Sequence, residues 1–176
     1  HTRLQGDWSS DVCSSDLGPF STSARARHIG RDGLGKILYF GGENSSVSTL
    51  LKNEMLTISS KRFSPLAQFP EQLVDTAGEI WGDIFYFFSG RTNSVTRQLN
   101  DELRLQNLQT GTSTSIAIST VVSRFGHQSL VEDGLIYFTG GMQQDGQILD
   151  ETLILNTKNL NTDDPRFITE IGRAHV

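Results

Sequence analysis

The sequence predicts an all-β repeat protein, and three observations support this prediction. Three segments align with one another, at 25–42, 73–90 and 124–141. Their apolar runs are short, rich in β-branched and aromatic residues, and bounded by Asp-Gly, Gly-Asp or Gly-Gly pairs, which is typical of strands joined by tight turns. No stretch keeps a helical period of apolar residues over three turns, so helices are not expected.

Each aligned segment consists of a turn, an apolar strand and a glycine pair. The first and third segments also begin with an Arg-x-x-His motif, 16 residues before the glycine pair. The second segment has Leu73 and Thr76 at the places of the arginine and the histidine, and Ser89-Gly90 for the pair. We expect these recurring residues to have structural roles: Arg25, His28, Gly41, Gly42, Gly90, Arg124, His127, Gly140 and Gly141.

The remaining strands follow from the polar stretches between apolar runs. A second short strand is expected after each glycine pair, at 53–58, 100–105 and 150–155, and an outer strand at 112–120. Hairpin turns with positive φ are expected at Asp32-Gly33, Gly82-Asp83 and Asp133-Gly134. The strand before each glycine pair is expected to be buried on both faces, and the pair to allow close backbone approach.

This order of features, with its period of about 50 residues, resembles the kelch repeat. The resemblance implies a β-propeller, here incomplete, with about three four-stranded antiparallel blades at 18–72, 73–120 and 121–169. These would be divergent blades, because the third strands carry Met55, Leu103 and Leu153 where kelch units usually have a tyrosine. A closed propeller needs roughly four to eight blades, so we expect the sequence to be a piece of a longer protein.

The two ends of the chain, 1–17 and 170–176, are expected not to be native. The stretches "GDWSSDVCSSDL" and "EIGRAHV" can both be back-translated into one common short-read library adapter. Both ends are therefore assigned as adapter-derived and left out of the fold prediction.

The composition of the remaining residues, 18–169, excludes several classes of protein. They contain 13 basic and 16 acidic side chains, so no positive field suited to nucleic acid is present. They contain no cysteine, since Cys13 lies in the adapter segment, which excludes thiol catalysis, disulfides and zinc-thiolate sites. The longest apolar run, 84–88, is far too short for a membrane segment. The compartment is undetermined, with a slight preference for the cytoplasm.

No catalytic, cofactor or metal site is predicted. The stretch 30–36 fits the beginning of a phosphate-binding loop, but a strand follows it instead of a helix, so it is interpreted as a hairpin turn. His28 and His127 fall in different repeats and are expected to be structural instead of metal ligands. Arg25 and Arg124 are expected to bind backbone carbonyls or neighbouring carboxylates.

A ligand-binding face is predicted from strand order. In a four-stranded antiparallel unit, the loop after the second strand and the segment after the fourth emerge at the same end. The loops after the second strands, 43–50, 91–98 and 142–148, are polar and vary among repeats whose strands agree. The candidate contact residues are Glu43, Asn44, Arg91, Asn93, Arg97, Gln143, Gln144 and Asp145.

Two functions remain open at this point. Kelch propellers commonly serve as protein-recognition modules, so the resemblance implies a protein partner, without a cofactor, and a complete propeller that is monomeric. The alternative is part of a propeller enzyme, similar to galactose oxidase, which uses copper, or to sugar mutarotases, which use no metal. The sequence favours the recognition module, because it shows no convergent set of acid, base and nucleophile.

Overall fold

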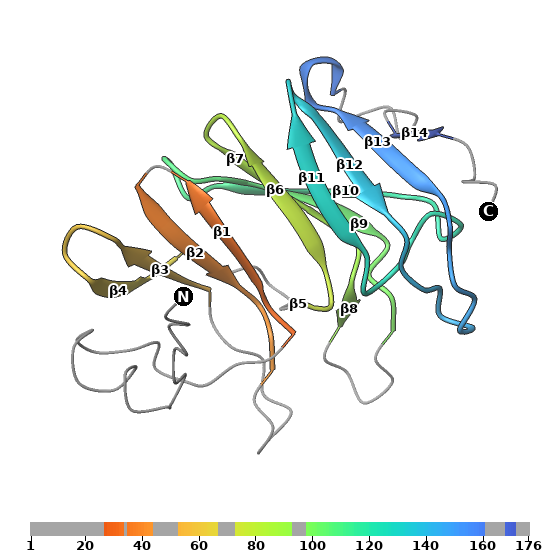
Figure 1. Cartoon of the computed structure of the whole chain (residues 1–176), viewed down its shortest axis with the longest axis horizontal. Helices are drawn as coiled ribbons and strands as arrows, with labels where there is room; N and C mark the ends of the chain where they lie inside the picture. The colour runs from red at the N-terminus through yellow and green to blue at the C-terminus, as the bar shows by residue number, and fades with distance from the viewer. Residues whose placement is uncertain are drawn as a thin grey trace, which may run out of the picture.

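The computed structural model describes residues 27–33, 35–43, 53–66, 73–92, 98–160 and, as backbone only, 168–171. Within these ranges the strands form three four-stranded antiparallel sheets and one two-stranded sheet, with no α-helix (Figure 1). The prediction of an all-β antiparallel fold is therefore confirmed for the described part of the chain.

In each of the large sheets the strands pair in chain order. The first sheet contains β1 (Ile29–Gly33), β2 (Lys36–Phe40), β3 (Glu54–Thr57) and β4 (Arg62–Pro65). The second sheet contains β6 (Ala77–Trp81), β7 (Ile84–Phe88), β9 (Glu102–Asn107) and β10 (Ser113–Ala117). The third sheet contains β11 (Gln128–Glu132), β12 (Leu135–Thr139), β13 (Thr152–Asn156) and β14 (Ile168–Ile171), with the short 3-10 helix η2 (Thr157–Asn159) after β13. The two-stranded sheet pairs β5 (Leu73–Val74) with β8 (Arg91–Thr92).

The strands predicted from the sequence correspond closely to these elements. The stretches 53–58, 100–105 and 150–155 overlap β3, β9 and β13, and 112–120 contains β10. The last strand, β14, extends two residues into the segment 170–176.

The three sheets lie face to face, and their first strands β1, β6 and β11 are neighbours (Figure 1). Phenylalanines fill the spaces between them. The ring centroid of Phe40 lies 4.1 Å from that of Phe85, between the first and second sheets. The centroids of Phe88 and Phe138 lie 4.6 Å apart, between the second and third sheets. Each such buried side chain contributes about 2–3 kcal/mol of hydrophobic free energy.

The prediction that every strand before a glycine pair is buried on both faces is correct for β7 and wrong for β2 and β12. Four consecutive residues of β7 are buried, because this strand lies in the middle sheet. In β2 and β12 buried residues alternate with half-buried or exposed ones. The reason is that a sheet neighbours only one face of each among the described residues.

Both positions of each glycine pair have positive φ. The values are 60° and 90° at Gly41 and Gly42, and 66° and 97° at Gly140 and Gly141. A Cβ atom on Gly141 would lie 2.9 Å from the Cβ of His127, closer than side chains pack. The expected close approach is thereby confirmed at Gly141, whereas a Cβ on Gly140 would make only an ordinary contact, 3.7 Å from the carbonyl oxygen of Leu149.

The hairpin turns follow the prediction in two of three cases. Asp133 and Gly134 have φ of 49° and 79°, and Gly82 has φ of 59°. In the first sheet the predicted position is wrong, because Gly33 still pairs with Lys36 and the positive φ lies at Gly35.

Candidate functional site

The first residues after β2, β7 and β12 lie at the same end of the sheets, as strand order requires (Figure 1). Three of the eight predicted contact residues, Asn44, Asn93 and Arg97, lie outside the described residues. The other five fall into two separate places. Gln143, Gln144 and Asp145 line a pocket, whereas Glu43 and Arg91 belong to an ion-pair network.

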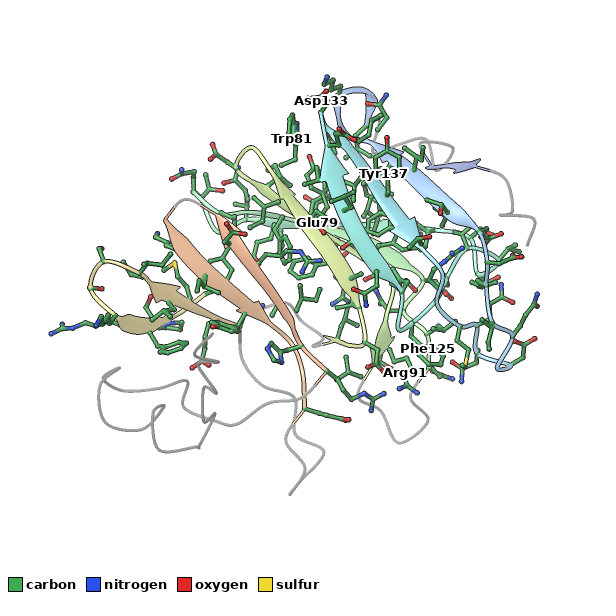
Figure 2. All side chains as sticks on the ribbon, viewed as in Figure 1. Glu79, Trp81, Arg91, Phe125, Asp133 and Tyr137 are labelled. Atoms are coloured by element: carbon green, nitrogen blue, oxygen red, sulfur yellow. The ribbon has the colours of Figure 1, made fainter. Side chains whose placement is uncertain are left out.

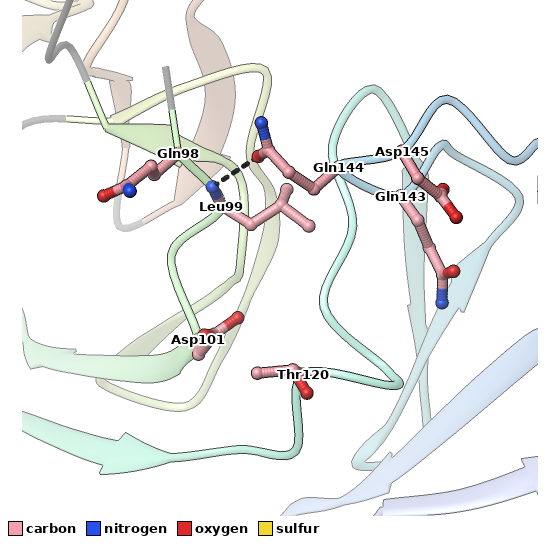
Figure 3. Close-up of a pocket in the computed structure, with 7 residues that line it drawn as sticks. All are labelled: Gln98, Leu99, Asp101, Thr120, Gln143, Gln144 and Asp145. Carbon is pink, nitrogen blue, oxygen red and sulfur yellow. Dashed lines mark hydrogen bonds between the residues drawn. The ribbon is translucent and has the colours of Figure 1, made fainter. Parts of the chain in front are cut away.

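The pocket lies between the loops of the second and third sheets and has a volume of about 680 Å³ (Figure 3). The lining residues are Gln98, Leu99, Asp101, Thr120, Gln143, Gln144 and Asp145. Four of these were not among the predicted contacts, although Gln98 ends the predicted loop 91–98 and Thr120 lies in the segment that joins β10 to β11. With three amides, two carboxylates and one hydroxyl, the pocket presents mainly hydrogen-bonding groups.

Hydrogen bonds between the two loops hold the pocket in shape. The backbone N–H of Leu99 donates to the Oε1 atom of Gln144 at 3.0 Å, which joins the second sheet to the third (Figure 3). The Nε2 atom of Gln143 donates to the carbonyl of Val121 at 2.9 Å. Each glutamine therefore uses one amide atom for the scaffold. The second amide atom of each makes no hydrogen bond within the described residues.

The ion-pair network centres on Asp75. The carboxylate of Asp75 accepts hydrogen bonds from Arg27 Nε at 2.7 Å and from Arg91 Nε at 3.1 Å. Arg27 also binds Glu43 at 2.6 Å, and the guanidinium of Arg91 lies 4.1 Å from the ring centroid of Phe125 (Figure 2). Burial lowers the pKa of Arg27, but its hydrogen bonds to Asp75 and Glu43 outweigh this, so the pKa lies above the usual value. The network is charge-balanced and links the ends of two sheets.

Arg124 has the structural role expected for it. Its side chain is fully buried and donates hydrogen bonds to the carbonyl oxygens of Val122 and Gly140 and to the carboxylate of Glu151. Arg25, its counterpart in the first repeat, lies outside the described residues.

The two repeat histidines differ from each other. His127 is buried, with its ring edge-on to Phe88 and Phe138. Burial and, to a lesser extent, the nearby charge of Arg124 lower the pKa of His127 to about 3, against a smaller opposing contribution from the backbone of Phe88. His28 is exposed and contacts the ring of Tyr39. The two histidines were expected to have the same structural role, but only His127 is buried. The reason is that His127 faces the second sheet, whereas no described sheet covers the corresponding side of the first sheet.

The described residues contain no group of three or more His, Cys, Asp or Glu side chains that could hold a metal ion. Among the same residues, no helix is long and apolar enough to cross a membrane. No protein-family model matches the chain, and no curated protein matches it with significant sequence similarity.

Proposed function

We propose that the chain is part of a kelch-type β-propeller whose loop-bearing end recognises a protein partner. Three similar sheets stacked face to face support the propeller. So do the glycine pairs, because the same hydrogen bond joins successive repeats: Gly42 N–H donates to Leu73 O, and Gly90 N–H donates to Arg124 O. A stack in which each repeat contacts its neighbour in the same way is characteristic of repeat architectures.

The main support for a role in recognition is the pocket. Loops of two successive sheets converge on it, they differ in sequence while the strands repeat, and they offer unused amide atoms and carboxylates. Polar loops held by a rigid β scaffold are a common arrangement for binding surfaces. The described lining has no catalytic pairing of a nucleophile with a base, so the residues favour binding over chemistry.

A binding experiment with a matched control tests this role. Partners are first captured on the full-length chain and identified, and each is then purified. The affinity of each purified partner is measured for the wild type and for a pocket variant carrying Gln98→Ala, Gln144→Ala and Asp145→Ala. The control carries Ser59→Ala and Ser60→Ala, two exposed turn residues at the opposite end of the strands.

We expect the pocket variant to weaken binding by about tenfold or more and the control to leave it unchanged, since contact residues commonly contribute 1 kcal/mol or more each. A partner that binds the pocket variant as tightly as the wild type would contradict the proposal. Binding of a free sugar by the chain, abolished in the pocket variant, would favour the propeller-enzyme alternative instead.

A further inference from the structure

The pocket between the loops of the second and third sheets is negatively charged. Within its described lining, Asp101 and Asp145 carry carboxylates and no residue carries a basic side chain. Figure 3 shows Asp101 and Asp145 on opposite sides of the pocket, on segments that belong to different sheets. A ligand that enters between these segments therefore meets negative charge from both sides.

The carboxylate of Asp101 has no partner of its own. The residue is half-buried, yet its side chain makes no hydrogen bond or ion pair within the described residues. Its backbone carbonyl accepts from the N–H of Ile118 at 2.9 Å, which fixes the position of the residue at the start of β9. Taking a carboxylate partly out of water costs free energy unless a donor or a cation replaces the water. The carboxylate is thus available to a ligand that brings one.

The other free atoms of the pocket are also mostly acceptors. Gln143 uses its Nε2 atom for the carbonyl of Val121, so its Oε1 atom, an acceptor, remains free. The Oδ1 atom of Asp145 accepts from the backbone N–H of Gln147 at 3.0 Å, which leaves Oδ2. Gln144 keeps a free amide donor, because its Oε1 atom accepts from a backbone N–H. The ligand that fits this set has several donors and a positive charge.

We infer that the pocket binds an arginine side chain of the protein partner. A guanidinium group has five N–H donors, no acceptor and a permanent positive charge, and its planar fork fits a carboxylate. The apolar stem of an arginine can lie against Leu99, which also lines the pocket. This inference rests on the recognition role proposed above and specifies which group of the partner enters the pocket.

An apolar residue beside the pocket favours a protein as the source of the guanidinium. Val121 is 70% exposed and directly follows the lining residue Thr120. Its carbonyl accepts the hydrogen bond from Gln143, so it lies next to the pocket. The side chain of Val121 offers apolar contact area to the residues that flank an arginine in a chain, which a free small cation lacks.

Peptide titrations of the full chain test the inference. They are followed in two-dimensional NMR spectra that correlate each amide proton with its nitrogen. The probes are acetylated and amidated tripeptides with alanine at both ends and arginine, citrulline or glutamate in the middle. Citrulline has the shape of arginine but a neutral urea group in place of the guanidinium. We expect the arginine peptide to shift the backbone signal of Leu99 and the side-chain signals of Gln144, and the other two peptides to bind about tenfold more weakly or not at all.

Three variants locate the contact. Asp101→Asn and Asp145→Asn keep the shape of the side chain, and each should raise the dissociation constant of the arginine peptide about fivefold or more, because a charge-assisted hydrogen bond is lost. Asp133→Asn is the matched control: it removes one charge from an exposed turn at the opposite end of the strands (Figure 2). Its φ of 49° suits asparagine, so this variant should bind the arginine peptide like the wild type. The same spectra verify that each variant is folded.

Three results would overturn the inference. The first is the absence of shifts with the arginine peptide; if calcium chloride then shifted the same signals, the pocket would bind a metal ion instead. The second is equal binding of the arginine and citrulline peptides, or binding that neither Asp101→Asn nor Asp145→Asn weakens, which would show that charge is not recognised. The third is tighter binding of free arginine than of the peptide, which would make the ligand a small molecule.

The recognition role of the pocket and its preference for arginine can fail separately. A captured partner that binds the pocket variant more weakly than the wild type would support the recognition role even if the arginine peptide did not bind. In that case only the preference for arginine would be wrong.

Discussion

The guanidinium of Arg124 donates a hydrogen bond of 2.5 Å to the carboxylate of Glu151, and the arginine side chain is completely buried. The same group also donates to the carbonyl oxygens of Val122 and Gly140. One side chain thereby joins the segment before β11, the glycine pair after β12 and the residue before β13. A buried charge of this kind is tolerated only when its partners are complete.

Arg124→Met should lower the free energy of unfolding by about 3 kcal/mol, because it leaves the carboxylate of Glu151 and two carbonyl oxygens without their donor. Urea unfolding followed by circular dichroism measures this loss. Glu151→Gln is the matched control: it keeps an acceptor for the guanidinium and should cost clearly less. An Arg124→Met protein as stable as the wild type would show that Arg124 stabilises the fold by packing alone.

The buried ring of His127 makes stability depend on pH. Its pKa in the folded protein is about 3, below the value of about 6.5 in an unfolded chain. Between these values the unfolded chain binds a proton that the folded protein does not. The stability is therefore fully present above about pH 6.5 and falls as the pH decreases towards 3, by up to about 1.4 kcal/mol per pH unit.

Substituting His127 by Leu should remove this contribution. The difference in unfolding free energy between the variant and the wild type, measured from about pH 4 to 8, should change with pH below about 6.5 and be constant above it. His28→Leu, the same substitution at the exposed equivalent position, is the matched control. If the unfolding free energy of His127→Leu decreased with falling pH as steeply as that of the wild type, groups other than His127 would be responsible for the pH dependence.

Local chemistry explains which features the sequence could predict. The need for positive φ at Gly140 and Gly141 is a property of the turn itself, so the glycine pair was visible without any tertiary information. The turn after β1 was misplaced because the pairing of Gly33 with Lys36 extends the hairpin beyond Asp32-Gly33. Strand pairing, and not the turn dipeptide, decided the position there.

The burial of each strand and the set of residues that line the pocket depend on how the sheets stack, so they could not be predicted from the sequence of single strands. β2 and β7 have similar apolar runs, yet among the described residues only β7 is covered on both faces. No periodicity within a strand encodes what covers it. The pocket joins Gln98 to Gln144, residues from loops of different sheets, through the hydrogen bond that Gln144 accepts from Leu99. The repeat pattern predicted the end at which these loops emerge, but not which side chains meet.

The second glycine of the pair is constrained by contact as well as by φ, and two substitutions separate these effects. Gly146 has φ of 91° with no atom near the position of a Cβ, so Gly146→Ala should cost about 1 kcal/mol from backbone strain alone. At Gly141 a Cβ would also lie 3.0 Å from the carbonyl oxygen of Phe125, in addition to its contact with His127. Gly141→Ala should therefore cost about 2 kcal/mol more, measured by urea unfolding. Equal losses would mean that the segment containing Phe125 and His127 moves aside freely.

Ser89 occupies the place that glycine has in the other two repeats, with φ of 51°. Its hydroxyl compensates for the strain: Oγ donates to the carbonyl of Asn100 at 2.8 Å and accepts from the backbone N–H of Arg124 at 2.9 Å. Ser89→Ala keeps the strain and loses both hydrogen bonds in a buried site, so it should cost about 2–3 kcal/mol. Ser89→Gly loses the same hydrogen bonds but relieves about 1 kcal/mol of strain, so it should be the more stable of the two variants. Denaturant unfolding of the wild type and the two variants gives the order of their stabilities. An alanine variant as stable as the wild type would show that the hydroxyl of Ser89 does not stabilise the fold.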